Sequence, residues 1–293
     1  MITLFAVPKP FIGHIDTIQR NALRSWTLLN PKCEIILFGD EQGTAEIATE
    51  LCVRHISEVQ CNEYNTPLIS DIFEVAQKQA RHNIVCYVNA DLILMRDFMH
   101  AVAKVLRRNK RFLLVGQRWN LDITEPIDFE SDWENGLIAR LTHEAQLEPP
   151  NGIDFFVFQR GTFEKILPFV VGRPCWDNWL IYRARELRIN VIDATGVLSV
   201  IHQNHDYSHV PEGTGKAWHG PEADYNQELL GSRDRLFTIL DATHLLTPSG
   251  LIPALGFTHL RRRCEQLPAL LPVIKPIIQR IGKLKKQLSR SNG

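Results

Sequence analysis

Short apolar runs alternate with segments of helical periodicity along most of the chain. The apolar runs are rich in β-branched and aromatic residues, which favours buried strands. The expected strands are Ile2–Val7, Glu34–Phe38, Ile84–Asn89, Phe112–Val115, Asp154–Phe158, Asn190–Asp193 and Val197–His202. Strands that alternate with helices are typical of a mainly parallel sheet covered by helices, so the pattern predicts an α/β fold.

Apolar side chains three or four residues apart mark the helices between these strands. The expected helices are His14–Leu29, Thr44–Leu51, Leu68–Ala80, Phe98–Leu106, an acidic one near Asp132–Glu144, and one from Trp176 through Glu186. After about residue 117 the periodicity weakens and long polar loops appear. Loops of this length inside a compact domain are usually functional or mobile.

The charge is unevenly distributed, although the 33 basic and 33 acidic residues cancel. Residues 258–293 contain nine Lys or Arg and one Glu, a net charge of +8, so residues 1–257 carry −8. An acidic body argues against a general nucleic-acid binder, because phosphate neutralisation dominates that affinity. We therefore expect one domain at 1–256, with halves at 1–117 and 118–256, followed by a basic amphipathic tail at 257–293.

The tail and the cysteines indicate where in the cell the protein is expected. Aliphatic and cationic residues alternate in Pro276–Lys286, as in segments that contact anionic membranes peripherally. A solvated tail or an oligomer contact is the alternative, and the oligomeric state stays open. The six cysteines form no CxxC pair, and the N-terminus begins with a strand instead of a signal-peptide pattern. These features predict a cytoplasmic protein, with the inner face of the cell membrane as a site for the tail.

The sharpest chemical feature is the segment Ile84–Met95. Its first half is a strand buried on both faces, and Asn89 and Asp91 follow where that strand ends. Positions i and i+2 of an extended chain point the same way, so both oxygens are expected to face one crevice at the carboxyl edge of the sheet. Hard cations such as Mg²⁺ or Mn²⁺ prefer oxygen ligands. The alternative is a turn that merely ends the strand.

The segment Tyr87-Val-Asn-Ala-Asp91 resembles the aspartate-x-aspartate motif of nucleotide-sugar glycosyltransferases with the type A (GT-A) fold. In that family the motif holds a divalent cation on a nucleotide diphosphate. Asn89 replaces the first acid, which leaves Asp91 as the main ligand. The resemblance covers roughly residues 1–225. It implies a twisted, mainly parallel sheet flanked by helices, a nucleotide-diphosphate sugar as donor, Mn²⁺ or Mg²⁺ as cofactor, and a glycan or lipid-linked acceptor.

The resemblance assigns the nucleotide and the metal to residues 1–117, and the acceptor to residues 118–256. It places Val7, Pro8 and Lys9, at the end of the first strand, beside the donor. Asn89 and Ala90 join this donor site. Lys9 is expected to meet a phosphate, and a solvated loop lysine is the alternative.

Three further residues are expected near the nucleotide. Asp40 follows the second strand, where similar enzymes bind the base or the ribose. The competing interpretation is that Asp40 is the N-cap of the next helix. Ser70 and Asp71 open the helix before the metal-binding strand, and Asp71 is alternatively a carboxylate that favours the positive helix start.

Residues after the fourth strand are expected to bind sugar or acceptor. Arg118 is suited to clamp a phosphate or a sugar hydroxyl, and Trp119 offers a ring face for a sugar. An arginine stacked on a tryptophan at the surface is the alternative. Asp154, at the start of a later strand, is expected to bind sugar hydroxyls or else to stabilise the preceding turn.

The helix that begins at Trp176 carries the expected catalytic base. Two Trp and two polar residues at a helix start exceed what packing needs, because Leu or Ala would suffice. In inverting type A enzymes an acid at a comparable helix start removes the proton of the acceptor hydroxyl, so Asp177 is expected in this role. Trp176 and Asn178 are expected to contact the acceptor. Asp177 is alternatively a helix cap, or a binding residue if the enzyme retains configuration.

Histidines cluster after the strand that ends near residue 202. Such density can indicate Zn²⁺, but in the type A family a C-terminal histidine reaches back to the metal or the diphosphate. His202 is the first choice for this role and His205 the second.

These expectations describe a metal-dependent, inverting glycosyltransferase. The nearest rival is a nucleotidyltransferase that makes sugar nucleotides, but it would open with a Gly-rich basic loop, and Pro8-Lys9-Pro10-Phe11 is not one. A non-catalytic sugar- or nucleotide-binding module is the other alternative, because Asn89 weakens the metal motif. No GxGxxG follows a strand, which argues against a dinucleotide oxidoreductase.

Overall fold

The computed structural model describes residues 1–107, 111–205, 218–271 and 273. Within them, a nine-stranded sheet has the order β13-β12-β10-β6-β9-β4-β1-β2-β3. Its strands are β1 (Ile2–Ala6), β2 (Glu34–Phe38), β3 (Arg54–Ile56), β4 (Ile84–Val88), β6 (Phe112–Val115), β9 (Phe155–Gln159), β10 (Asn190–Asp193), β12 (His244–Thr247) and β13 (Gly250–Pro253). Most pairs are parallel, and β9 runs antiparallel between β4 and β6. The predicted mainly parallel α/β sheet is confirmed.

Helices cover both faces of this sheet. They are α1 (Gly13–Thr27), α2 (Thr44–Glu50), α3 (Ile69–Gln79), α4 (Arg96–Leu106), α5 (Trp133–Leu141), α6 (Trp176–Glu186), α8 (Pro221–Leu230) and α9 (Phe257–Leu270), with short 3-10 turns η1 (Thr195–Val197), η2 (Arg233–Arg235) and η3 (Ile239–Asp241). The predicted helices exist: α6 has the predicted ends, and the ends of the others differ from the prediction by at most three residues.

Alternation along β1 shows how the sheet divides two cores. Leu4 packs with Trp26 of α1 in the core that α1, α2 and α4 cover. Phe5 points the other way and meets Phe73 of α3 edge-on at 5.2 Å, in the core that α3 and α6 cover. Both surfaces of the central strands are therefore apolar, which explains the uninterrupted apolar runs in the sequence.

A second, smaller sheet lies beside the first, with the order β5-β11-β7-β8. Its strands are β5 (Leu92–Ile93), β7 (Trp119–Leu121), β8 (Gln146–Leu147) and β11 (Ile201–Gln203). The prediction of one strand over Val197–His202 is wrong in its first part. The 3-10 turn η1 ends at Val197, the backbone N–H of Ser199 donates to Asp97 Oδ2 at 2.8 Å, and pairing begins only at Ile201.

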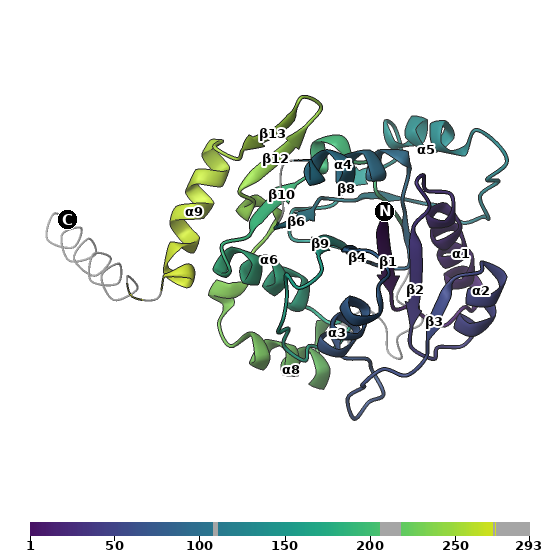
Figure 1. The fold of residues 1–293 in the computed structure, drawn as a ribbon, viewed down its shortest axis with the longest axis horizontal. Coiled ribbons are helices and arrows are strands. Elements are labelled where there is room, and N and C mark those ends of the chain that lie inside the picture. Colours follow the sequence, from purple (N-terminus) through teal and green to yellow (C-terminus); the bar gives the residue numbers. More distant parts are fainter. Residues whose placement is uncertain (108–110, 206–217, 272, 274–293) are drawn as a thin grey trace, which may run out of the picture.

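Helix α9 lies at the end of the main sheet beside β12 and β13, far from α1 and α2 at the other end (Figure 1). Arg262 of α9 forms a 2.5 Å ion pair with the buried Asp241 of η3, which fixes the helix to the body. The membrane-tail prediction lies partly outside the described residues, since 272 and 274–293 are not among them. Of the helices described, none has the length and apolarity that crossing a bilayer requires.

Candidate metal and donor site

A cavity of about 540 Å³ opens at the carboxyl ends of β1 and β4. The parallel pairing of these strands brings their ends to one edge, as expected for ligand sites of open α/β sheets. Predicted site residues that line it are Val7, Pro8, Lys9, Asn89, Ala90, Asp91, Arg118, Asp154, His202 and His205. The fold thus gathers ten of the predicted residues from five separate chain segments.

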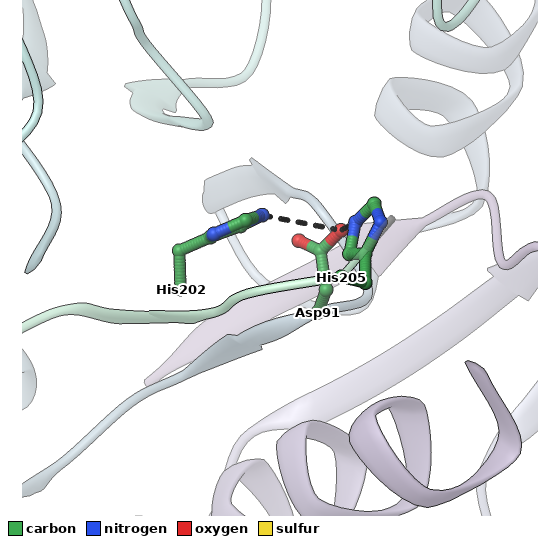
Figure 2. A group of neighbouring side chains, drawn as sticks. All are labelled: Asp91, His202 and His205. Atoms are coloured by element: carbon green, nitrogen blue, oxygen red, sulfur yellow. Dashed lines mark hydrogen bonds and ion pairs between the residues drawn. The ribbon is translucent and has the colours of Figure 1, made fainter. Parts of the chain in front are cut away.

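Asp91, His202 and His205, here called the Asp91 cluster, each offer a ligand atom within 4.8 Å of the others. His205 Nε2 lies 3.3 Å and His202 Nε2 3.9 Å from Asp91 Oδ2. Figure 2 shows the two imidazole rings on opposite sides of the Asp91 carboxylate. One carboxylate oxygen between two imidazole nitrogens is an arrangement that can bind a divalent transition-metal ion.

Pairing in the small sheet explains why these distant residues meet. Strand β5 follows Asp91 directly, and β11 pairs with it antiparallel, so that His202 lies opposite Leu92. The next residue, Gln203, is fully buried and donates through Nε2 to the backbone oxygens of Asp91, at 3.1 Å, and of Ile18, at 2.7 Å. These bonds fix β11 to the turn that carries Asp91.

Burial and a neighbouring cation set the charge of the cluster. Burial opposes ionisation of Asp91, but the Lys9 ammonium, with Nζ 3.5 Å from Oδ2, is the largest of the opposing effects, and the pKa of Asp91 lies well below its ordinary value. Burial lowers the pKa of His202 to about 3, so this imidazole is neutral. Asp91 is therefore ionised and His202 keeps a free electron pair, as metal ligands require.

Two polar atoms of the cluster are sealed from solvent without a hydrogen-bond partner in the described part of the chain. They are Oδ1 of Asp91 and Nδ1 of His202. Buried polar atoms are nearly always bonded, and a bound ion is one of the recognised explanations for an exception. The cluster thus fits a bound cation both in its donor types and in these unpaired atoms.

Asn89 has a different contact from the one expected. Its side-chain Nδ2 donates to Asp154 Oδ1 at 2.6 Å, and its backbone N–H donates to the Asp154 carbonyl at 2.9 Å. Asn89 lines the same cavity as Asp91, but the residues that the structure gathers on the Asp91 carboxylate are the two histidines. A metal bond from Asn89 stays a prediction.

Asp154 is the centre of a buried polar network. Arg118 donates to Asp154 Oδ2 through Nη1. It also donates to Asn120 Oδ1 through Nε, at 3.0 Å. Burial raises the pKa of Asp154, and Arg118 opposes this shift. Asn120 in turn donates to Glu148 Oε2 at 2.6 Å. The network fixes the Arg118 side chain at the wall of the cavity, and it does not stack on Trp119 in the contacts described.

Asp177 lines a smaller cavity of about 160 Å³ that shares Asn89 and Asp154 with the first. The residue is partly exposed, but its Oδ1 is sealed and lacks a hydrogen-bond partner among the described residues. Burial, with Asp154 nearby, raises the pKa of Asp177 to about 7 against the weaker effect of backbone N–H groups. The N-cap position of α6 is Cys175, and Asp177 lies in the first turn, where its carboxylate meets the backbone N–H groups of Asp177 and Asn178, so the helix-start alternative holds in part.

Three predicted donor residues lie elsewhere. Asp40 and Asp71 line a hollow that adjoins the larger cavity and shares Glu41, Asn65 and Pro67 with it, and Ser70 lines a third, separate one. The N-cap of α2 is Gly43, so the interpretation of Asp40 as that cap is wrong. Asp71 lies in the first turn of α3, which agrees with the helix-start alternative. Its carboxylate accepts a 2.8 Å hydrogen bond from the backbone N–H of Gln60, which lies outside the helix.

The predicted acceptor residues also separate. Trp176 lines the smaller cavity and packs edge-on against Tyr87, with ring centres 5.0 Å apart. Asn178 donates to the backbone oxygen of Phe237 at 2.8 Å, a structural role. Trp119 lies on β7 and is not among the described residues that line either cavity.

Sequence reasoning missed several residues of the larger cavity, among them Gln19 and Arg173. Gln19 is 1% exposed and lies on the apolar face of α1, where a polar residue is an exception to the periodicity. That exception was a usable signal. Arg173 also lines the cavity and forms an ion pair with Glu222 of α8. Nothing in the local pattern links Arg173 to Glu222, because 49 residues separate them.

Comparisons with solved structures identify the fold. The structure of S. aureus TarS residues 1–349 with UDP-GlcNAc matches with a TM-score of 0.50 at 14% identity, over 78% of this chain and 64% of that one. The structure of GalNAc-T7 with UDP, GalNAc and Mn²⁺ matches with a TM-score of 0.50 at 12% identity, over 79% of this chain and 48% of that one. The chain therefore has the GT-A fold of nucleotide-sugar glycosyltransferases.

The chain spans less than two thirds of the length of either protein. No family model matches the sequence, and no curated protein matches it.

Proposed function

We propose that the protein is a metal-dependent glycosyltransferase that moves a sugar from a nucleotide-diphosphate donor to an acceptor hydroxyl, with inversion at the anomeric carbon. One observation carries the proposal. The Asp91 cluster and the buried carboxyl of Asp177 line adjoining cavities that share Asn89 and Asp154. Metal-assisted group transfer to a hydroxyl requires a cation site and a general base in adjoining parts of one site. The fold, shared with proteins whose structures hold UDP-GlcNAc or UDP and Mn²⁺, supports the same donor class.

The Asp91 cluster would hold the divalent cation. When bound, such a cation acts as a Lewis acid that stabilises the negative charge of the departing nucleotide diphosphate. Two imidazole nitrogens and one carboxylate oxygen suit Mn²⁺ better than Mg²⁺, which favours oxygen ligands. Zn²⁺ accepts the same donors, so activation by Mn²⁺ over Zn²⁺ is an outcome to measure.

Asp177 would act as the general base. In the proposed step the carboxylate takes the proton of the acceptor hydroxyl, and the acceptor oxygen forms a bond to the anomeric carbon. The bond between that carbon and the diphosphate oxygen breaks, and its electron pair leaves with the diphosphate. A pKa of about 7 leaves a substantial ionised fraction near neutral pH, and the conjugate acid forms without a large penalty.

The two halves of the domain, residues 1–117 and 118–256, supply different residues to the two cavities. Residues 1–117 supply Lys9 and Asp91 to the larger cavity, and residues 118–256 supply Arg118, the histidines and Asp177. We assign the nucleotide and the metal to the first half and the acceptor to the second. Because β9 lies between β4 and β6 within one sheet, the two halves form one structural unit.

The proposal includes peripheral contact of 257–293 with an anionic membrane at the cytoplasmic face. Phe257, Leu260 and Leu267 are exposed at helical spacing along α9, and the tail carries a net charge of +8. Exposed apolar side chains beside cations are typical of interfacial helices. Sedimentation with vesicles tests the contact: binding to anionic vesicles that Phe257→Ser weakens supports it, and equal binding to neutral vesicles contradicts it.

A donor assay tests the enzymatic proposal. The protein is incubated with a panel of nucleotide-diphosphate sugars and Mn²⁺, and the released nucleotides are quantified. We expect nucleoside diphosphate from one donor class, and a turnover about 100-fold or more lower in Asp177→Asn, with donor affinity retained. Glu63→Gln, an acid-to-amide change at an exposed loop, is the matched control. Pyrophosphate exchange would favour a nucleotidyltransferase, and donor binding without turnover in the unmodified protein would favour a binding module.

A further inference from the structure

The ammonium group of Lys9 contacts the Asp91 cluster directly. Lys9 Nζ lies 3.0 Å from His205 Nε2 and 3.5 Å from Asp91 Oδ2. A lysine ammonium has three donors and no acceptor, so His205 Nε2 accepts in this contact, and its 3.3 Å approach to Asp91 Oδ2 is then not a hydrogen bond. Lys9 donates to the electron pair of His205 Nε2 that a metal ion would need as a ligand. The ammonium also contacts Asp91 Oδ2, the oxygen that would bind the same metal ion.

The backbone of Lys9 is fixed by a residue outside the cluster. Gln19 Oε1 accepts from the Lys9 N–H at 2.7 Å, and Gln19 Nε2 donates to the Lys9 carbonyl at 2.8 Å. Gln19 is 1% exposed and lies in α1. Because this reciprocal pair holds the main chain, only the four-carbon side chain of Lys9 can move the ammonium toward or away from the cluster.

The ammonium balances a buried negative charge. Asp91 is 7% exposed, and Lys9 is the lysine that ion-pairs with it among the described residues. A buried carboxylate without a counter-charge is strongly unfavourable. A divalent ion bound at the same oxygen would supply that counter-charge itself and would repel the ammonium.

We propose that Lys9 is the resident counter-cation of the Asp91 cluster and that a divalent metal must displace it to bind. The inference rests on the metal role assigned above. The Lys9 side chain is 33% exposed and lines the larger cavity, so the displaced ammonium stays within the space proposed for the donor diphosphate. The diphosphate then provides the ammonium with a new anionic partner. Metal alone binds weakly, metal together with a diphosphate binds tightly, and by linkage each raises the affinity of the other.

The test measures Mn²⁺ binding to the full chain without nucleotide, from the electron paramagnetic resonance signal of free Mn²⁺. Lys9→Met removes the charge and keeps the length of the side chain. We expect it to bind Mn²⁺ at least about ten-fold more tightly than the unmodified protein. Lys9→Gln is the second variant, and both are checked for an unchanged thermal midpoint.

Lys32→Met is the matched charge control. Lys32 is an exposed lysine just before β2, at the amino ends of the strands, whereas the cavity lies at their carboxyl ends. It should leave Mn²⁺ affinity unchanged. A gain of the same size in Lys32→Met, or equal or weaker Mn²⁺ affinity in both Lys9 variants, overturns the proposal.

Asp91→Asn separates this inference from the proposed function. If Mn²⁺ binds with equal affinity with and without the Lys9 ammonium, and Asp91→Asn abolishes the binding, the metal site stands and the counter-cation role fails. If neither the unmodified protein nor Lys9→Met binds Mn²⁺, the metal role of the Asp91 cluster fails, and this inference fails with it.

Discussion

Replacement of Asp177 by Asn should stabilise the protein at alkaline pH. Burial raises the pKa of Asp177 from an ordinary value of 3.8 to about 7. The pKa of this acid is higher in the folded protein than in the unfolded chain. Its contribution to the free energy of unfolding is therefore fully present below the pKa of the unfolded chain, and it is lost as the pH rises through the pKa of the folded protein. The unmodified protein therefore loses stability between about pH 4 and pH 7, and the neutral amide of Asn does not titrate.

The size of the effect follows from the two pKa values. Each unit of pKa difference corresponds to about 1.4 kcal/mol, so the full difference of about 3 units amounts to about 4 kcal/mol above pH 8. About 1.5 kcal/mol of this is already lost at pH 5, which leaves at most about 2.5 kcal/mol to appear between pH 5 and pH 8.5. Asp177 borders a cavity, and water that enters it would reduce the figure.

The assay compares urea unfolding of the two proteins at both pH values. Other titrating groups cancel in the difference, provided that the substitution leaves them unchanged. The free energy of unfolding of Asp177→Asn should rise relative to the unmodified protein by about 2 kcal/mol from pH 5 to pH 8.5, whereas Glu63→Gln should show no such trend. A difference that stays constant with pH, or falls, would refute the assignment of a raised pKa to the Asp177 carboxyl.

Four further outcomes are expected. The kcat/KM of the unmodified protein should rise about ten-fold per pH unit below pH 7 and level off above it, as a base with the pKa of Asp177 requires; a flat pH profile would exclude it as the titrating base. Chelation should abolish turnover, and Mn²⁺ should restore more of it than Mg²⁺; Asp91→Asn should remove the response to metal, and full activity in chelator would contradict the metal role. Arg118→Met should lower the free energy of unfolding by about 3 to 5 kcal/mol, because it leaves Asp154 as an uncompensated buried charge, and Arg118→Met with Asp154→Asn should recover part of that loss in urea titrations. Gln19→Ala should cost about 1 to 3 kcal/mol, since it leaves the Lys9 backbone groups unpaired; a loss below the error of the titration would deny Gln19 that role.

Local pattern was sufficient for most of the elements. Glu34–Phe38, Phe112–Val115 and Asn190–Asp193 were predicted with the ends that the structure has, because a strand buried on both faces admits only apolar side chains and stands out in any sequence. The antiparallel insertion of β9 was not predictable in this way, since the direction of a strand depends on its neighbours and leaves no local signal.

The candidate site was predictable in part. Asp91 follows a buried strand, and parallel pairing alone brings such positions to one edge. Asp40 also follows a buried strand, yet it lines only the hollow beside the larger cavity. The sequence pattern was equivalent at the two positions, and only the location of the small sheet and of the histidines distinguishes them.

By itself, the sequence determined most of the long central strands and the helices between them, that they build an α/β sheet, and that an acidic group stands at the end of β4, because each of these depends on side chains within a few residues of one another. It did not predict the short strands β3, β5, β7 and β8, the pair β12 and β13, or the helices α8 and α9. Tertiary structure alone decided that His202 and His205 lie on Asp91, that Asn89 turns to Asp154, and that the Lys9 ammonium contacts the cluster. Those contacts join residues 65 to 196 positions apart. Their formation depends on strand pairing and burial across the whole domain, which local periodicity does not record.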